Sequence, residues 1–403
     1  MGQTGSGEEV KLATQEACIV GIGQSDFGFS LGKSPLRLQA EAFNAALADS
    51  GLSRGDVDGF VTAHGAPRGV DYEEFISAMG LDIRYVDQAW SHGRWATGVT
   101  TSAALAVMAG LADVVAVCNT TSTARGYQRH LGTPAGYGLD EGLRDFGGGH
   151  GEWGTTGIDT PGSATALVAK RYMEKYGAGS DDLARIASGY RRNAQLNPKA
   201  ILRDKELTLE NYYDEPIIAA PFRRSDYALA NEGSNVMIIT SVERARDLPN
   251  KPVAIAGAQS IRANRDNYVL FSRPGLGVGF GGDFPFIADR QPVYDHAGVS
   301  QSDVDGLYIY DSFSSNLWML LEQFGFCADG EAPAWVAEHG MAPDGVLPIN
   351  TNGGLQSEGH YSGYAHLVEM VRQLRGTAGP RQIADAEILQ WAAPWGDSLI
   401  LTA

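Results

Sequence analysis

The chain has 403 residues, of which 43% are hydrophobic, and it carries a formal net charge of −17. This acidic balance argues against nucleic acid and anionic membrane surfaces as partners, since both require clustered cations. Three cysteines at no metal spacing indicate a reducing compartment without a disulfide framework, and no apolar run approaches the ~20 residues of a membrane span, so we expect a cytoplasmic protein.

The first part of the chain alternates apolar strands with helices. After a loose tail over residues 1–16, we predict a first half that spans residues 17–250. Its expected elements are a strand at 17–23, a helix at 35–51, a strand at 60–63, a buried helix at 95–110, a central parallel strand at 113–118 and a strand at 236–239. Residues from about 120 to 228 break this alternation with Gly, Tyr and charged residues, and we expect them to be an inserted region that covers a cleft.

A second half is predicted over residues 251–403. Its expected elements are a strand at 253–258, a helix at 287–298, a strand at 307–310, helices at 316–324 and 361–374, and a closing strand near 398–401. Strands that alternate with helices predict an α/β protein with parallel sheets covered by helices.

Two stretches of the chain repeat each other. Gly51–Val61 and Gly298–Tyr308 both read as a helix end, a tight turn and a buried strand, and Asp56 and Asp303 within them are 303 − 56 = 247 residues apart. A second echo, around Gln24 and Gln259, has an offset of 259 − 24 = 235 residues. Two echoes in the same order imply that one α/β unit is duplicated. Equivalent turns of the two halves should then converge on one site.

A Gly-rich turn in the second half is the first candidate for chemistry. The sequence Asn350–Gly354 leads into a predicted helix that begins near His360. Glycines allow a sharp turn, and the free amides of a helix N-terminus favour negative charge. A histidine at that position can serve an oxyanion, although a helix cap or a buried core histidine is the alternative.

Tyr310 is the second candidate, because it ends the strand that follows the repeated turn. Ligands of open parallel sheets lie beyond the carboxyl ends of the strands, so its phenol should point into the expected crevice. A phenol can act as an acid or base when its pKa is perturbed; packing against the next helix is the alternative. Asp311, beside it, either orients this loop or caps a helix.

These segments carry a resemblance to a known family. The stretches Ala228–Asn235, Tyr310–Phe313, Leu320–Cys327 and Asn350–His360 resemble the thiolase superfamily, most closely its lipid-transfer-protein branch. The resemblance implies a duplicated thiolase fold, five-layered αβαβα, with two pseudo-symmetric halves. In thiolases the turn that corresponds to His360 carries the oxyanion histidine, and the position of Tyr310 carries Asn or His.

The chain departs from thiolases where their cysteines belong. The segment 91–98 should hold the nucleophilic Cys but has none, and Trp95 or a neighbour takes its place. The C-terminal turn at 390–397 also lacks the second Cys. Without a thiolate no acyl-enzyme forms by the usual route. An enolate stabiliser with an acid or base, but no nucleophile, fits aldol cleavage.

That combination resembles the thiolase-like aldolases that remove steroid side chains in bacteria. They cleave a β-hydroxyacyl-CoA to a ketone and a short acyl-CoA. A tyrosine occupies the place of Tyr310 in them, and a second tyrosine takes the position of His360, beside which this chain has Tyr361. The resemblance also implies a homodimer that binds a small zinc-ribbon and OB-fold (DUF35-type) protein as a heterotetramer. Zinc is expected only in that partner, and no cofactor is expected in this chain.

The sequence therefore predicts a retro-aldol mechanism. Tyr310 removes the proton of the β-hydroxyl group, His360 and the amides near Gly353 and Gly354 hold the enolate oxygen, and Asp311 orients the loop. The residues expected to contact the acyl-CoA substrate are Gly353, Gly354, Trp95, Tyr361 and Asn350. Two alternatives stay open: a Claisen-type thiolase or acyltransferase with an unconventional nucleophile such as Ser91 or Cys118, and a non-catalytic thiolase-fold subunit.

Overall fold

The computed structural model describes residues 16–63, 69–89, 96–122, 161–261 and 291–403. In the first half, strands and helices alternate much as predicted. The elements are β1 (Ala17–Gln24), α1 (Pro35–Ser50), β2 (Gly59–Thr62), α2 (Tyr72–Met79), β3 (Tyr85–Gln88), α3 (Ala96–Met108), β4 (Val114–Ser122), β7 (Glu232–Ser241) and α8 (Val242–Ala245). Helix α1 has local signals at both ends, since Ser34 caps it, Pro35 takes its first turn and Gly51 ends it at φ +75°.

The described part of the inserted region contains three helices and a small two-stranded sheet. Its elements are α5 (Pro161–Tyr176), α6 (Ser180–Gln195), α7 (Leu209–Tyr213), β5 (Ile217–Ala219) and β6 (Phe222–Arg223). The second half then adds β8 (Val253–Gln259), α9 (Pro292–Ala297), β9 (Gly306–Ile309), α10 (Asn316–Gln323), α11 (Ala332–His339), α12 (Gly354–Ser357), α13 (Tyr364–Leu374), β10 (Ile388–Ala392) and β11 (Ser398–Thr402).

Helix α13 begins three residues later than predicted. Gly363 has a φ of +90°, which a continuous right-handed helix does not accept. The backbone at His360 and Tyr361 therefore belongs to a turn between α12 and α13. Strand β10 was absent from the predicted elements, because its residues were interpreted only as part of the C-terminal turn.

The strands form one mixed sheet in the order β3-β2-β4-β7-β1-β8-β11-β10-β9. We call β3, β2, β4, β7 and β1 the first half-sheet, and β8, β11, β10 and β9 the second half-sheet. The prediction that the strand at 113–118 is parallel to its neighbours is correct on one side only, since β4 is parallel to β2 but antiparallel to β7. The equivalent strand of the second half, β11, is likewise antiparallel to β10, so the reversed direction belongs to the duplicated unit. The half-sheets join through two antiparallel register pairs between β1 and β8, Cys18 with Ala254 and Ile19 with Val253.

The repeated stretch builds the same structure twice. In the first copy, Asp58 Oδ1 accepts a hydrogen bond from the backbone N–H of Val114 at 2.8 Å, which ties the start of β2 to the start of β4. In the second copy, Asp305 Oδ2 accepts the N–H of Ile388 at 2.9 Å, and ties β9 to β10 in the same way. Moreover, the strand order β2-β4-β7-β1 of the first half corresponds to β9-β10-β11-β8 of the second. The duplicated architecture predicted from the sequence is confirmed.

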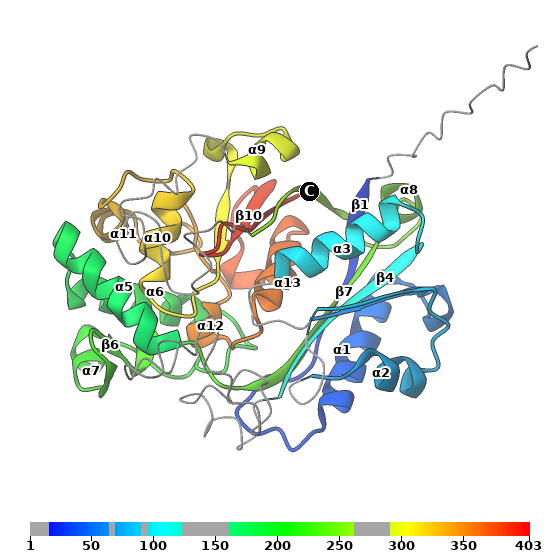
Figure 1. Cartoon of the computed structure of the whole chain (residues 1–403), viewed down its shortest axis with the longest axis horizontal. Coiled ribbons are helices and arrows are strands. Elements are labelled where there is room, and N and C mark those ends of the chain that lie inside the picture. Colours follow the sequence, from blue (N-terminus) through cyan, green and yellow to red (C-terminus); the bar gives the residue numbers. More distant parts are fainter. Residues whose placement is uncertain (1–15, 64–68, 90–95, 123–160, 262–290) are drawn as a thin grey trace, which may run out of the picture.

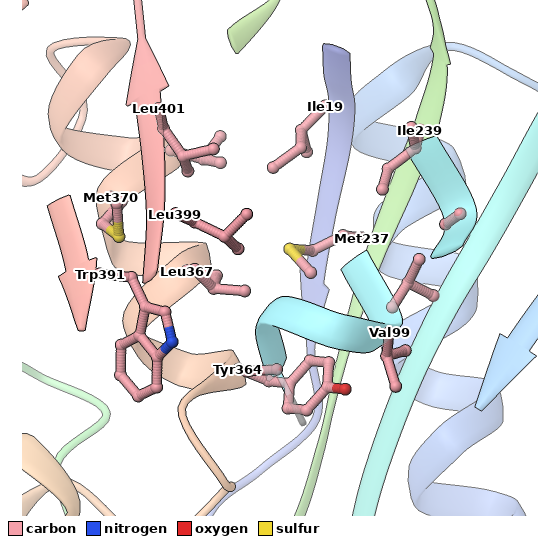
Figure 2. Packing of buried hydrophobic residues seen from close by; sticks show 14 of the residues in the cluster. Ile19, Val99, Met237, Ile239, Tyr364, Leu367, Met370, Trp391, Leu399 and Leu401 are labelled. Atoms are coloured by element: carbon pink, nitrogen blue, oxygen red, sulfur yellow. The ribbon is translucent and has the colours of Figure 1, made fainter. Parts of the chain in front are cut away.

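Buried residues gather in three clusters, which correspond to three helical layers. The middle cluster joins the facing sides of both half-sheets through α3 and α13, and Figure 1 shows these two helices between the half-sheets. Figure 2 shows Leu399 and Leu401 of β11 meeting Ile19 and Met237 of the first half-sheet in this layer. One outer cluster lies under α1 and α2, and the other lies on the far face of the second half-sheet. The order of layers is thus αβαβα, as predicted.

The inserted region does not sit where its position in the sequence suggests. Helices α5 and α6 pack on the outer face of the second half-sheet, together with α10, and Tyr172 of α5 stacks on Trp318 of α10 at a centroid distance of 5.0 Å. The described helices of this region thus complete an outer layer, and its expected role in covering a cleft stays a prediction. Among the described residues, no helix is long and apolar enough to cross a bilayer.

Candidate active site

Tyr310 and His360 face each other, as the sequence analysis required. The Oη atom of Tyr310 lies 3.2 Å from Nε2 of His360, and the ring centroids are 6.0 Å apart. Tyr310 directly follows β9, and its backbone N–H donates to the carbonyl of Ala392 at the end of β10 at 2.9 Å. Its own carbonyl accepts a hydrogen bond from Asn316 Nδ2 at 3.0 Å. The phenol is thus fixed at the carboxyl end of a parallel strand pair, where open sheets bind ligands.

His360 is held by a residue of the first half. Its backbone N–H donates to Oδ1 of Asn231 at 2.6 Å. Asn231 immediately precedes β7 and is fully buried, whereas His360 is half-buried. Asn231 lies in the segment Ala228–Asn235 that carries the family resemblance, but nothing in its sequence pattern indicates a role for this residue. No local pattern could have revealed a contact between residues 129 positions apart.

Two tryptophans surround the phenol of Tyr310. The ring of Trp395 lies 5.5 Å from that of Tyr310, and the ring of Trp391 lies 6.4 Å away at an interplanar angle of 90°. Trp391 is fully buried, and a Cβ atom on Gly363 would come within 2.4 Å of its ring. In the sequence, the turn at residues 390–397 stands out only by its missing cysteine. The two indoles, four residues apart, were the signal that this side of the site is aromatic.

Asp311 binds backbone rather than the reacting groups. It is fully buried, and its Oδ1 atom accepts the N–H of Leu355 in α12 at 2.9 Å. The same oxygen lies 3.2 Å from Nε2 of His366 on α13. Of the two roles weighed for Asp311, the structure therefore favours the helix cap, which fixes α12 against the end of β9.

Gly353 and Gly354 do not offer free amides. The N–H of Gly353 donates to the carbonyl of Asn350 at 2.9 Å, the N–H of Gly354 donates to Oδ1 of Asn352 at 3.4 Å, and both glycines are buried. They have φ values of +103° and +68°, and an added Cβ would lie 2.5 Å from Ala194 in the first case and 2.2 Å from Asp311 in the second. These glycines permit close packing and a left-handed backbone. The prediction that their amides hold the enolate oxygen is corrected accordingly.

Asn350 and Tyr361 also have structural partners. The Asn350 side chain accepts the N–H of Ile309 at 2.7 Å and donates to its carbonyl at 3.2 Å, as a neighbouring strand would. Tyr361 is fully buried, and its hydroxyl donates to the carbonyl of Glu232 at 3.0 Å. Both side chains therefore pack between elements, and neither is placed as the substrate contact that the sequence analysis expected.

Cys18 and Cys118 are not positioned as nucleophiles. Cys18 and Cys118 are fully buried in the outer cluster under α1. Burial raises the pKa of the Cys18 thiol to about 12, and it raises the pKa of Cys118 further above its usual range. Because a reactive cysteine needs an accessible thiolate, Cys118 is excluded as the alternative nucleophile. Trp95 and Ser91, the other residues predicted for this region, lie outside the described residues.

A search of the described residues for three or more His, Cys, Asp or Glu side chains that could share a metal ion finds none. The expected absence of a cofactor in this chain stays a prediction. So does the expectation that zinc belongs to a partner protein.

Comparisons with known proteins show which family this chain resembles. A family model described as thiolase C-terminal domain-like matches residues 290–393. A steroid side-chain-cleaving aldolase of Thermomonospora curvata is 33% identical over 362 residues, 90% of this chain and 91% of that relative. A 17-hydroxy-3-oxo-4-pregnene-20-carboxyl-CoA lyase of Mycobacterium tuberculosis is 35% identical over 376 residues, 91% of this chain and 93% of that relative. A solved structure described as an Ltp2-ChsH2(DUF35) aldolase has a TM-score of 0.82 at 30% identity and covers 98% of this chain and 99% of that one.

Proposed function

Because the chain belongs to the thiolase-like aldolases that cleave steroid side chains, we propose that it is a carbon–carbon lyase acting on a β-hydroxyacyl-CoA whose β-carbon is part of a steroid. The products are a ketone and a short acyl-CoA, such as propionyl-CoA or acetyl-CoA. The observation that carries the proposal is the 3.2 Å contact between Tyr310 Oη and His360 Nε2. This contact provides an acid–base pair without a thiol.

The contact supports a specific proton path. A neutral imidazole whose Nε2 is unprotonated accepts the phenolic proton of Tyr310, and the phenolate then accepts the proton of the substrate's β-hydroxyl group. The Cα–Cβ bond breaks, its electron pair moves to the thioester as an enolate, and the former carbinol carbon becomes the ketone. Transfer of the proton from the His360 imidazolium to Cα completes the acyl-CoA and restores the neutral imidazole, so the reaction balances without an oxidant or reductant.

The same histidine stabilises the enolate. Once it holds the phenolic proton, the imidazolium of His360 is a cationic hydrogen-bond donor close to the reacting atoms, and such donors are worth most where water is excluded. We assign this role to His360 alone, since the N–H of Gly353 already binds the carbonyl of Asn350. The aromatic rings of Trp391 and Trp395 beside Tyr310 favour a large apolar substrate half.

The proposed assembly follows the same resemblance. The neighbour with the TM-score of 0.82 is described as a complex with a DUF35 protein. We propose that this chain likewise forms a homodimer, binds a small DUF35-type protein that carries zinc, and reaches a heterotetramer in the cytoplasm. Size-exclusion chromatography with light scattering on the co-expressed pair tests this assembly.

The reaction is tested in the condensation direction. The chain is co-purified with its small partner and incubated with propionyl-CoA or acetyl-CoA and a panel of steroid, aromatic and aliphatic ketones. A new β-hydroxyacyl-CoA in the presence of a steroid ketone is expected. Mass spectrometry of the protein during turnover should show no acylated side chain, and a covalent acyl-enzyme would instead establish the Claisen alternative.

A further inference from the structure

The turn that carries His360 is docked on the first half by two consecutive contacts. The N–H of His360 donates to Oδ1 of Asn231 at 2.6 Å, and the hydroxyl of the next residue, Tyr361, donates to the carbonyl of Glu232 at 3.0 Å. Two adjacent residues of the second half thus bind two adjacent residues of the first. The catalytic imidazole stands at this junction of the halves.

The second of these contacts is embedded in rigid packing. The Tyr361 ring stacks on Phe27 at a centroid distance of 4.1 Å. A Cβ atom on Gly359 would come within 2.4 Å of the Tyr361 ring, and one on Gly233 within 2.7 Å. The Tyr361 ring is therefore enclosed from several sides, and its position does not depend on a single hydrogen bond.

The first contact, to Asn231, differs because it acts on the main chain of His360 itself. His360 lies outside both helices that flank it, since α12 ends at Ser357 and α13 starts at Tyr364, so helical hydrogen bonds do not fix its backbone. Gly359, the residue before it, has a φ of +154°, a backbone conformation that side chains seldom adopt. The direction in which the imidazole leaves the chain thus depends strongly on the bond to Asn231.

We propose that Asn231 is a positioning residue for the aldol cleavage: its amide oxygen fixes the backbone of His360, so that Nε2 stays within hydrogen-bond reach of Tyr310. The inference rests on the proposed function. A neutral amide suits this task, because it accepts the N–H without adding a charge next to an imidazole that must take up and release a proton. Being fully buried, the amide oxygen also escapes competition from water.

The test compares variants of Asn231 with a control on the same strand. Asn231→Leu keeps the approximate volume and removes the acceptor, whereas Asn231→Asp keeps an oxygen at that place. The matched control is Thr240→Val at the far end of β7, which removes one buried hydrogen bond, from Oγ1 to the carbonyl of Asp113 at 2.7 Å. Each variant is assayed with the partner protein for kcat and KM, and its free energy of unfolding is measured.

Asn231→Leu is expected to lower kcat about 100-fold with KM changed less than about threefold, since a misplacement of about 1 Å has such an effect on a catalytic group. Asn231→Asp keeps the acceptor but adds an ionisable group beside the imidazole, so it should recover part of that loss and change the pH profile of kcat. Thr240→Val should lose similar stability with kcat within about twofold of the wild type. Equal kcat values for Asn231→Leu and Thr240→Val would overturn the proposal, as would a loss in Asn231→Asp as large as in Asn231→Leu. If Asn231→Leu does not fold, Asn231→Ala replaces it.

A second readout separates this inference from the proposed function. In protein with ¹³C-labelled histidine, the ring signal of His360, assigned by its loss in His360→Gln, reports the imidazole environment without any turnover. The signal should move in Asn231→Leu and stay in place in Thr240→Val. An unmoved signal contradicts the positioning role. An inactive wild type with a moved signal contradicts only the proposed reaction.

Discussion

The two copies of the repeated turn end in the same backbone geometry and in very different side chains. After β2, the N–H of Ala63 donates to the carbonyl of Cys118 in the middle of β4 at 3.1 Å; after β9, the N–H of Tyr310 donates to the carbonyl of Ala392 at the end of β10 at 2.9 Å. The offset between Ala63 and Tyr310 is again 310 − 63 = 247 residues. The scaffold is thus duplicated, while this position holds alanine in the first copy and tyrosine in the second. The two copies therefore share their backbone geometry and differ in the side chain at this position.

The largest expected effect comes from removing the phenolic oxygen of Tyr310. Tyr310→Phe is expected to lower kcat by about 1,000-fold, because the base for the β-hydroxyl proton is lost. The control is Tyr308→Phe, which deletes another buried hydroxyl of the same strand region, bonded to Thr351 Oγ1 at 2.7 Å. That variant should keep kcat within about threefold of the wild type. If kcat fell to a similar extent in both variants, the cause would be altered packing rather than lost proton transfer.

Removal of the imidazole should have the next largest effect. His360→Gln is expected to lower kcat about 100-fold, as when one oxyanion donor is lost. Because Tyr310 and His360 act through one hydrogen bond, the double variant Tyr310→Phe/His360→Gln should be little worse than Tyr310→Phe alone. Steady-state kinetics on the four proteins of this cycle measure the coupling. Strictly additive losses in the free energy of activation would contradict the proposed proton path.

Paired substitutions in the repeated motif test whether it stabilises both halves equally. Asp58→Ala and Asp305→Ala each remove the acceptor that ties two strands together, and each should lower the free energy of unfolding by about 1–2 kcal/mol. Asp58 also pairs with Arg84 at 2.6 Å, but this half-exposed pair adds at most ~0.5 kcal/mol. Urea titrations of both variants measure the losses. If one substitution lowers the free energy of unfolding more than twice as much as the other, the motif does not stabilise both halves equally.

The smallest expected effect concerns Asp226, a residue that contacts the segment after β9 of the second copy. The carbonyl of Asp226, at the end of the inserted region, accepts the N–H of Ser314 at 3.1 Å. Burial raises the pKa of the Asp226 carboxyl to about 6. Since its pKa in the unfolded chain is near 3.8, the folded protein binds more protons between these values, and stability falls as the pH rises from about 4 to 6.

Asp226→Asn should relieve that cost, because an amide cannot ionise. Its oxygen can still accept the hydroxyl of Tyr212 and the N–H of Arg223, which now bind Oδ2 of Asp226 at 2.7 Å each. We expect the variant to be about 1 kcal/mol more stable than the wild type at pH 8 and equal to it near pH 3. Thermal unfolding across this pH range makes the comparison. A variant that is less stable than the wild type at pH 8 would show that the buried carboxylate is needed there.

The sequence predicted what recurs locally and what resembles a known family. The motif around Asp58 and Asp305 is short and occurs twice in the sequence, so the duplication could be recognised. The pairing of Tyr310 with His360 followed from the family resemblance. The distance between these two side chains could not be predicted, because His360 lies in a turn whose backbone is bound by Asn231 of the other half.

Glycine was the main source of error. A Gly-rich turn before a helix is compatible with an anion site and equally with tight packing, and the sequence cannot distinguish these cases. The outcome at Gly353 and Gly354 was decided by Ala194 and Asp311, which come from other elements. The start of α13 was misjudged for a related reason, since the left-handed backbone at Gly363 is required by the ring of Trp391 packed against it.

Helices α5 and α6 precede β8 to β11 in the chain, yet they cover the face of that later half-sheet. During synthesis, both helices leave the ribosome before any of the strands against which their apolar sides will rest. A fragment that stops near residue 250 would therefore display uncovered apolar surface, and one that begins there would expose the outer side of β9 and β11. Although the two halves share an architecture, neither is a self-sufficient folding unit, and attempts to express them separately should yield aggregation unless both fragments are present together.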